Sequence, residues 1–444
     1  MNQIIFEGVR CFHTRHICPL RPITLLLGEN SSGKTTFLAL TRIAWDVAQG
    51  ELSEDVFNEE PFLLGAYDQI ASYRGGKAGR AKSFAIGMQT SLQLDPRQKA
   101  SQLFTEEVKI TARFVSQGSQ SKLKEWVFES GAFKLVARQS TKQTRFDITI
   151  TTPKGFQVIN ERVLFRGSLS IRRMLNELRF WLSQGTRDSN KDLEKTSLIL
   201  SEAEFRTLQQ ITFEISNTLG PRPYAFAPIR TKPQRTYDPL KEVPRPEGSH
   251  VPMVLARTLL DETEEKRPLQ EALSKYGTAS GLFNNVEAKR KGHKESDPFQ
   301  ISVKTVGPAH NLVDVGYGIS QVLPILVDVV EHPKGSRFLL QQPEVHLHPK
   351  AQAELGSFLA TLAKEQNKHF VIETHSDYLI DRIRMDIRDK KYLRPDDVAI
   401  LYFERSPGGV EIHQLELDEY GNVSNAPPTY RTFFLEEERR LLGV

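Results

Sequence analysis

The chain has 444 residues, of which 39% are hydrophobic and 26% are charged, and its formal net charge is +4. This length and composition allow a large buried core spread over two or three domains, and they exclude a disordered or fibrous chain. No apolar run approaches the roughly 18 residues of a membrane-spanning helix, and the first residues lack the charged and apolar regions of a signal peptide. We therefore expect a cytoplasmic protein with no membrane partner.

The two cysteines, Cys11 and Cys18, indicate a reducing compartment. They bracket His13 and His16, but the spacing of these four residues does not match a known zinc site. We expect a β-hairpin that buries the cysteines rather than a metal centre.

A glycine-rich loop follows an apolar strand at 23–27 and precedes a helical pattern that begins near Thr36. This order of strand, loop and helix is the context in which the G-x-x-x-x-G-K-[ST] pattern indicates nucleotide binding. Glycines let consecutive N–H groups face a phosphate, and the helix N-terminus adds partial positive charge. Lys34 is predicted to reach the β- and γ-phosphates of ATP, and the Thr35 hydroxyl to bind Mg²⁺. The predicted nucleotide-binding residues of the loop are Gly28, Glu29, Asn30, Ser31, Ser32, Gly33, Lys34, Thr35 and Thr36.

The middle of the chain changes pattern several times. Alternating apolar and polar residues between 84 and 160 predict a half-exposed antiparallel sheet. Periodic apolar residues such as those of Ile171–Leu182 predict helices between 162 and 220. The predicted segments that follow are an irregular proline-rich stretch at 221–248, a helical piece near 252–276, a polar loop at 287–298 and a strand at 299–306.

After residue 310 helices and strands alternate regularly. The predicted order is a helix at 319–331, a strand at 337–342, a helix at 350–366, a strand at 369–374, a helix at 376–389 and strands at 398–403 and 409–415. The nucleotide fold is therefore predicted to be split. Its N-terminal part is 1–83, an inserted β-rich and helical lobe is 84–310, and its C-terminal part is 311–444.

Four further segments accompany the phosphate loop. They are Asp314-Val-Gly-Tyr-Gly-Ile-Ser-Gln321, Phe338-Leu-Leu-Gln-Gln-Pro-Glu-Val-His-Leu-His-Pro349, Val371-Ile-Glu-Thr-His-Ser376 and Phe62-Leu-Leu-Gly-Ala-Tyr-Asp-Gln-Ile70. With these motifs in place the chain resembles ABC-type ATPase heads, and most closely the AAA-15/OLD-like branch of prokaryotic defence and DNA-repair ATPases. The resemblance is clearest at 1–50 and 310–425. It implies an α/β P-loop NTPase fold with an ABC-type ATPase head, an antiparallel β lobe and a helical insertion.

The segment that ends at Gln321 is similar to the ABC signature. The resemblance implies that Gly318 and Ser320 of one protomer contact the γ-phosphate held by another. Glycines permit a close approach, and Ser320 offers a hydroxyl at a helix start, where N–H groups also point at anions. The alternative is a simple helix N-cap in a glycine turn.

The string Gln341-Gln342-Pro343-Glu344 lies where a Walker B strand would end. Gln341 is predicted beside Mg²⁺, and Gln342 can orient a water through its carbonyl oxygen but cannot accept a proton. Three explanations stay open. In the first, Glu344 is the general base. In the second, hydrolysis is slow and ATP acts as a dimer clamp. In the third, one glutamine was introduced to trap ATP. We favour the first two together.

Other polar residues have predicted roles at this site. His375 resembles the switch histidine that contacts the γ-phosphate, and Glu373 is a second candidate for the missing acidic role. Gln69 lies where a Q-loop would connect the lobes and is predicted to contact Mg²⁺, unless its segment is a plain surface loop. By spacing, His346 and His348 could bind a metal, but a dimer-interface loop is favoured.

The segment Ala227–Tyr237 combines prolines with basic residues, and similar strings recur in the AAA-15/OLD-like branch. Arg230 or Arg235 is predicted to contact an anion, either the nucleotide or a neighbouring subunit. A rigid solvated linker is the alternative, and the sequence does not decide between them.

The resemblance implies a homodimer or higher oligomer in which two heads sandwich ATP and open after hydrolysis to ADP and phosphate. The stretch from about 380 to the end is too short for a TOPRIM nuclease domain, so we expect a separately encoded nuclease or toxin as effector. That arrangement resembles anti-phage systems of the PARIS or Septu type. Two alternatives remain: a non-hydrolysing ATP-dependent scaffold, and a RecF-like repair ATPase that binds DNA through basic stretches at 74–82, 289–294 and 388–394.

Overall fold

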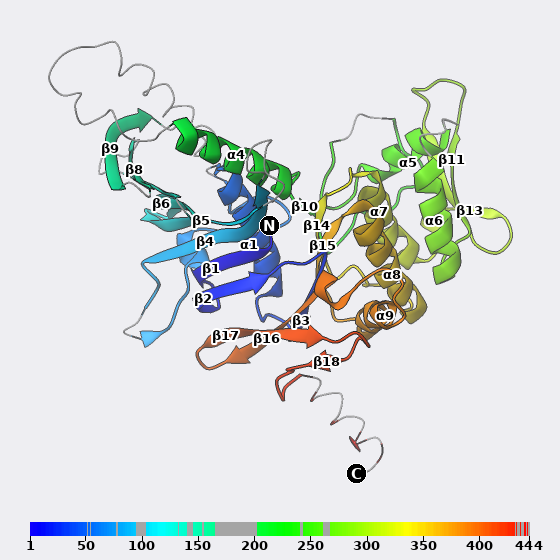
Figure 1. The fold of residues 1–444 in the computed structure, drawn as a ribbon. Helices are drawn as coiled ribbons and strands as arrows, with labels where there is room; N and C mark the ends of the chain where they lie inside the picture. Colours follow the sequence, from blue (N-terminus) through cyan, green and yellow to red (C-terminus); the bar gives the residue numbers. More distant parts are fainter. Residues whose placement is uncertain are drawn as a thin grey trace. The chain divides into compact units, whose positions relative to one another are not determined.

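The computed structural model describes most of the chain. The residues outside the description are 51, 54, 77–78, 95–103, 132, 140–144, 153–154, 165–201, 240–242, 261–266, 431, 433–435, 437–438, 441 and 443–444. The helix predicted at Ile171–Leu182 therefore lies outside the described residues. The chain forms two compact units (Figure 1). The first contains 1–20, 39–222 and 405–411, and the second contains 21–38, 223–404 and 412–444.

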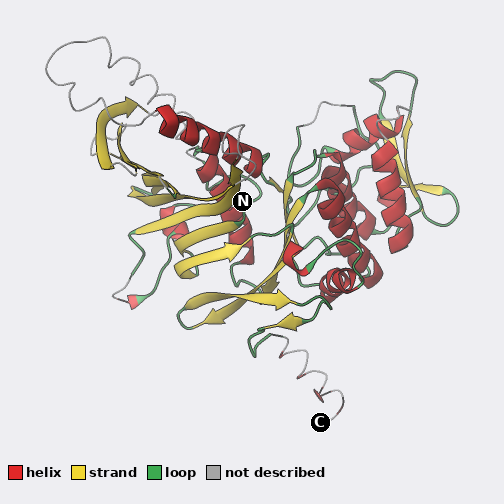
Figure 2. Ribbon diagram, in the orientation of Figure 1, coloured by secondary structure: helices red, strands yellow, loops and turns green. Residues whose placement is uncertain are grey.

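The first unit is built on an eight-stranded sheet in which neighbouring strands run antiparallel (Figure 2). Its strands, in spatial order, are β2 (Phe12–Pro19), β1 (Gln3–Val9), β4 (Ser83–Leu94), β5 (Phe104–Gln117), β6 (Gln120–Ser130), β7 (Phe133–Gln139), β8 (Arg145–Thr152) and β9 (Gly155–Leu164). This sheet is the predicted antiparallel lobe. The hairpin of β1 and β2 buries Cys18, as expected, whereas Cys11 is only half-buried, and both cysteines are free.

Strand β5 shows why this part of the sequence forms a sheet. Val108, Ile110, Ala112 and Phe114 are buried and occupy alternate positions. Because successive side chains of a strand point to opposite faces, this period of two places the apolar residues on one face. Helix α4 (Glu202–Leu219) and the short helix α2 (Tyr67–Ile70) belong to the same unit.

The second unit contains a seven-stranded sheet. Its order is β10 (Tyr224–Ala225), β14 (Arg337–Gln341), β15 (His369–Glu373), β3 (Ile23–Gly28), β16 (Val398–Ser406), β17 (Gly409–Leu417) and β18 (Val423–Ser424). The first five strands are parallel. Each is a short, mostly buried apolar run, as expected for parallel strands covered on both faces. The predicted fold class, an α/β P-loop NTPase with an antiparallel β lobe, is confirmed.

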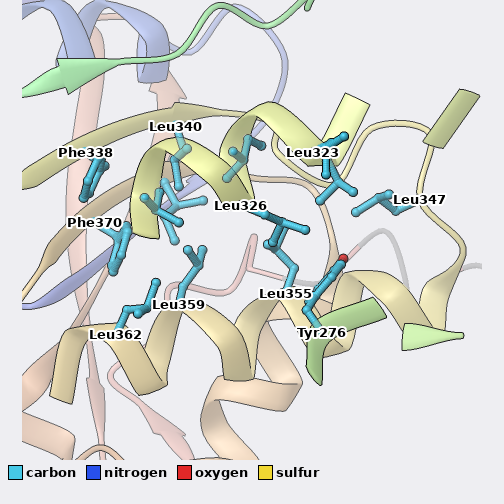
Figure 3. Packing of buried hydrophobic residues seen from close by; sticks show 14 of the residues in the cluster. Tyr276, Leu323, Leu326, Phe338, Leu340, Leu347, Leu355, Leu359, Leu362 and Phe370 are labelled. Carbon is cyan, nitrogen blue, oxygen red and sulfur yellow. The ribbon is translucent and has the colours of Figure 1, made fainter. Parts of the chain in front are cut away.

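Helices and a smaller sheet complete the second unit. The helices are α5 (Val251–Leu260), α6 (Arg267–Ser280), α7 (Tyr317–Glu331), α8 (Pro349–Gln366) and α9 (Asp377–Arg388), and helix α1 (Lys34–Gln49) begins here. The core cluster joins Leu323 and Leu326 of α7, Leu355 and Leu359 of α8, and Phe338 of β14 (Figure 3). Among the described residues, no helix combines the length and the hydropathy that crossing a bilayer requires.

The prediction of a loop at 287–298 is wrong in its first part. Strand β11 (Asn285–Arg290) pairs with β12 (Phe299–Lys304), which also pairs with β13 (Ala309–Asn311). Val286 is buried and Ala288 packs against the core, whereas the alternate residues Glu287 and Lys289 are charged and exposed. The sequence pattern missed this strand because its exposed face is strongly polar. The loop itself begins at residue 291.

A buried polar network fixes helix α7 to the segment before α5. His250 Nε2 donates to Asp328 Oδ1 at 2.9 Å, and the Tyr224 hydroxyl donates to Asp328 Oδ2 at 3.0 Å. His250 Nδ1 accepts from the Arg245 N–H, which agrees with a neutral imidazole protonated at Nε2. Burial, and then the charge of Asp328, raise the pKa of Tyr224. The phenol therefore stays a donor at neutral pH.

Replacing Asp328 with alanine should destabilise the second unit strongly. Removing the carboxylate leaves the neutral donors of His250 and Tyr224 without their acceptor, at a cost of about 1–3 kcal/mol for each donor. We expect the melting temperature to fall by on the order of 10 °C. The control is Asp381→Ala, which removes a partly exposed carboxylate that pairs with Arg384 at 2.7 Å. A fall no larger than that of the control would contradict the prediction.

Candidate nucleotide-binding site

The glycine-rich loop connects β3 to α1 inside the second unit. Gly28 has φ of +134°, and a Cβ atom there would lie 2.4 Å from the Phe403 carbonyl oxygen, so this position requires glycine. Ser31 also adopts the left-handed conformation, with φ of 59°. Lys34 Nζ donates to the carbonyl oxygens of Gly28 at 2.9 Å and Glu29 at 2.6 Å. The loop therefore closes around the ammonium group that is predicted to meet the phosphates.

Glu373 lies directly against the predicted Mg²⁺ ligand of the loop. The Thr35 hydroxyl donates to Glu373 Oε2 at 2.7 Å. Glu373 ends β15, next to β3 in the sheet, and is only 7% exposed. Burial raises the pKa of Glu373, while the Thr35 hydrogen bond and the charge of Lys34 act in the opposite direction. The sheet thus supplies an acidic residue from β15 beside a strand β14 that ends in glutamine.

Gln341 is the register partner of Glu373 on the neighbouring strand. Its side chain is buried, and its Oε1 atom has no hydrogen-bond partner among the described residues. An unsatisfied buried amide oxygen costs about 1–3 kcal/mol, so such an atom usually has a water, an ion or a ligand as partner. Gln342 has φ of 42°, and its N–H donates to the Glu373 carbonyl oxygen at 2.8 Å. This left-handed residue turns the chain out of β14.

Glu344 follows that turn and reaches the end of β15. It is 6% exposed, and its Oε1 accepts the N–H of His375 at 2.8 Å. Burial raises the pKa of Glu344, and the hydrogen bond from His375 and the charge of Arg230 oppose this rise. Partial desolvation and the charge of Lys34 lower the pKa of His375, so its imidazole is neutral at pH 7. The structure therefore brings the predicted base and the predicted switch residue into contact.

A cavity of about 410 Å³ adjoins this edge of the sheet. Gly28 and Glu29 of the loop line it together with His375, Tyr402 and Tyr430. The two tyrosine rings meet edge to face with centroids 5.5 Å apart. Space is therefore available beside the phosphate loop and His375.

The predicted signature starts helix α7, with Gly316 as its N-cap. Ser320 is 5% exposed, and its hydroxyl donates to the Tyr317 carbonyl oxygen at 2.8 Å. A Cβ atom at Gly318 would lie 2.6 Å from the His346 carbonyl oxygen, so the signature turn packs tightly on the loop after Glu344. The contact of Gly318 and Ser320 with a partner's γ-phosphate stays a prediction.

The two histidines after Glu344 have structural roles. His346 has φ of 69°, and its ring meets that of Tyr317 edge to face at 4.8 Å. His348 is the N-cap of α8 and accepts the Lys350 N–H at Nδ1. Among the described residues, no group of three or more His, Cys, Asp or Glu side chains could hold a metal ion. Metal binding and a dimer-interface loop, the two alternatives for His346 and His348, both stay predictions.

Two predicted contacts are placed differently from the rest. Gln69 belongs to the first unit, where its Oε1 accepts the Ala66 N–H at 2.9 Å and closes helix α2. Its predicted contact with Mg²⁺ stays a prediction. Arg235 pairs with Asp314 through two hydrogen bonds of 2.6 and 2.9 Å at an exposed position. The anion it contacts is thus a carboxylate of its own chain.

Arg230 was one of two open candidates, and the structure buries it to 2% exposure. Its Nη2 donates to the Gln341 carbonyl oxygen at 3.3 Å, and its N–H donates to Gln321 Oε1 at 3.4 Å. Gln321 had no predicted role of its own. Its place one residue after the signature serine in a buried helix was the available signal.

The basic stretch 388–394 is largely neutralised. Arg388 pairs with Asp389, Lys391 with Asp386 and Asp389, and Arg394 with Asp397. Acidic partners at these distances reduce the positive potential that a phosphate backbone would meet. This stretch is therefore a weak candidate for DNA binding.

The matched pair Gly318→Ala and Gly316→Ala tests the tight packing of the signature. Alanine normally stabilises a helix by up to about 1 kcal/mol over glycine, yet at 318 it would clash with the His346 carbonyl. We expect Gly318→Ala to destabilise by about 1–3 kcal/mol. A Cβ atom at Gly316 meets nothing within 4 Å, and we expect less than about 1 kcal/mol there. Thermal unfolding compares the two. Equal melting temperatures would contradict the described contact.

Comparisons with known proteins place the chain in a family. No curated protein matches it. Solved structures with a similar fold include the Smc head bound to the C-winged helix domain of ScpA, at 10% identity, TM-score 0.47 and coverage of 94% of this chain and 98% of that one. The SMC head domain from Thermotoga maritima gives 10% identity, TM-score 0.41 and coverages of 94% and 98%. The Smc head domain with a coiled coil and joint from Pyrococcus yayanosii gives 9% identity and a TM-score of 0.44, and the match covers 99% of each chain.

Two family profiles match the sequence itself. The profile of a family of unknown function, DUF3696, matches residues 393–430. The profile described as "AAA domain, putative AbiEii toxin, Type IV TA system" matches residues 128–381. That range includes the signature, the Gln341–Glu344 segment and His375, and it spans more than half of the chain. The protein therefore belongs to this family of AAA domains.

Proposed function

We propose that this protein is an ABC-type ATPase that binds ATP with Mg²⁺, hydrolyses it slowly, and uses the cycle to regulate a partner. The observation that carries the proposal is the 2.7 Å contact between Thr35 and Glu373. It brings the hydroxyl of a phosphate loop and a buried carboxylate to one edge of a parallel sheet. The carboxyl edge of such a sheet is where α/β proteins bind their ligands.

The described residues suit ATP and Mg²⁺. Lys34 and the N–H groups of loop 28–36 would hold the β- and γ-phosphates. Thr35 would contribute its hydroxyl and Gln341 its unpartnered buried oxygen to the Mg²⁺ site, with Glu373 as the nearby carboxylate. Magnesium commonly takes one or two protein oxygens and completes its shell with phosphates and water, so a closed protein cage is not needed. When bound, the ion neutralises charge on the phosphates.

Glu344 is the base in this proposal. A water oxygen attacks the γ-phosphorus, its proton passes to the Glu344 carboxylate, and the bond to the β,γ-bridging oxygen breaks to release ADP and phosphate. The raised pKa makes Glu344 a stronger base than an ordinary carboxylate. His375 would contact the γ-phosphate as a neutral donor, and Gln342 would orient the water. Two glutamines at the end of β14 leave a single proton acceptor after Pro343, which favours slow turnover.

Two heads would form the complete site. Lys34 and Thr35 of one protomer would face Gly318 and Ser320 of another, so ATP favours a closed dimer and hydrolysis releases it. In this arrangement Ser320 must leave its hydrogen bond to the Tyr317 carbonyl or act through its own N–H group.

The biological role proposed is that of a sensor in cytoplasmic anti-phage defence. The family description names a putative toxin of a type IV toxin–antitoxin system and names no partner. The resemblance to the AAA-15/OLD-like branch is what supports a separately encoded nuclease or toxin as effector, in a PARIS- or Septu-like arrangement. The ion-paired stretch 388–394 gives the RecF-like alternative less support. The double glutamine keeps the non-hydrolysing scaffold as the rival outcome.

Substitutions in the loop and at the base separate binding from hydrolysis. Lys34→Ala should lose ATP binding, because it removes the ammonium group that meets the phosphates. Glu344→Gln should retain binding and lower turnover by about 10²–10⁴-fold. The control Glu287→Gln changes an exposed carboxylate on β11 and should change neither. Calorimetric binding and release of phosphate give the two readouts. Turnover that survives Glu344→Gln would remove the proposed base, and wild type without turnover would favour the scaffold.

The oligomer should depend on nucleotide. We expect sedimentation to show the dimer mass for Glu344→Gln with ATP and Mg²⁺, because this variant cannot hydrolyse the ATP that holds the two protomers together. Without nucleotide, and for Lys34→Ala with ATP, the mass should be smaller. A mass that is independent of nucleotide would exclude the ATP-driven dimer.

A further inference from the structure

Arg230 combines a full positive charge with almost complete burial. It is 2% exposed, and burial lowers its pKa to about 10, while the charge of Glu344 acts to raise it again. An isolated buried charge is costly, so a buried cation near a carboxylate indicates compensation between the two. Arg230 also opposes the raised pKa of Glu344. Each residue therefore favours the charged form of the other.

The hydrogen bonds of Arg230 extend to both sides. Its Nη2 donates to the carbonyl oxygen of Gln341 at 3.3 Å, at the end of β14. Its backbone N–H donates to Gln321 Oε1 at 3.4 Å, on helix α7 next to Ser320. Arg230 thus touches the strand that leads to Glu344 and the helix that carries the signature.

Several polar atoms around Arg230 remain unsatisfied. Among the described residues, Arg230 Nε and Nη1 and Gln321 Nε2 are buried without a hydrogen-bond partner, as is Gln341 Oε1. A well-packed protein retains few such atoms, and several in one place point to a functional site. Two nitrogens of the guanidinium, Nε and Nη1, therefore have no acceptor, while the third, Nη2, donates to the end of β14.

We propose that Arg230 is a positioning residue of the hydrolysis site: it holds the end of β14, from which the chain turns to Glu344, and links this strand end to the signature helix through Gln321. The inference rests on the proposed role of Glu344 as base. It assigns Arg230 to the interior of its own protomer, rather than to a nucleotide or a neighbouring subunit. The other groups that surround Glu344 cannot replace it, because His375 offers a backbone N–H and Thr374 a neutral hydroxyl.

A double-mutant cycle between Arg230 and Glu344 tests this role. Arg230→Met should lower kcat about tenfold or more and leave the KM for ATP within about twofold, because the phosphate loop is untouched. Arg230→Lys should restore much of the loss, since it returns a positive charge. In a Glu344→Gln background, Arg230→Met should change single-turnover hydrolysis by less than about twofold, because the group that it positions is gone.

Controls separate the inference from the folding of the variants and from the proposed function. Arg138→Met changes an exposed arginine of the first unit, which pairs with Glu125, and should leave kcat unchanged. If Arg230→Met melts at a lower temperature, Arg230→Gln, which keeps polar groups, repeats the cycle. Equal kcat losses with and without Glu344, or no rescue by lysine, would overturn the inference. Turnover that is unchanged by Glu344→Gln would instead overturn the proposed base. The loss of ATP binding in Lys34→Ala would still test the nucleotide site in that case.

Discussion

The parallel alignment of β14, β15 and β3 is the constraint on which the site depends. Gln341 is in register with Glu373, and Glu373 is in register with Leu26, two residues before Gly28. The carboxyl ends of the three strands therefore meet at one edge, and everything that follows each strand is delivered to the same place. The hydrogen bond between Thr35 and Glu373 forms because this alignment brings the two side chains together. A register shift of one residue would turn that carboxylate to the other face of the sheet.

Three residues with a strained backbone lie at the same edge. Ser31, Gln342 and His346 are left-handed although none is glycine. Such conformations cost of order 1 kcal/mol or more each, and they persist when the surroundings determine them. Here Gln342 is held by its N–H bond to Glu373, and His346 is held between Tyr317 and Gly318. The strain lets the chain leave β14 abruptly and return Glu344 to the end of β15.

The sequence was sufficient for the local patterns of the site but not for its side-chain contacts. Apolar runs and glycine spacing predicted the phosphate loop, its strand and the alternating elements after 310, because these depend on neighbours in the chain. The strand β11 was missed because charged residues on its exposed face hid the alternation. The burial of Arg230 and the pairing of Thr35 with Glu373 join segments that are far apart in sequence, so only the register of the sheet could reveal them. Ser320 was expected to offer its hydroxyl to the γ-phosphate of another protomer, whereas in this structure the hydroxyl donates to its own helix turn.

The missing side chain at Gly318 has a mechanical consequence. With the His346 carbonyl only 2.6 Å from where a Cβ atom would lie, the start of α7 and the loop that carries Glu344 leave no slack between them. Closely packed contacts of this kind have low compressibility and transmit displacement. A push on the start of α7 would arrive at the carboxylate within the same protomer, with no hinge to absorb it. A single movement of α7 would then accompany the docking of a second protomer and also change the position of Glu344 for hydrolysis.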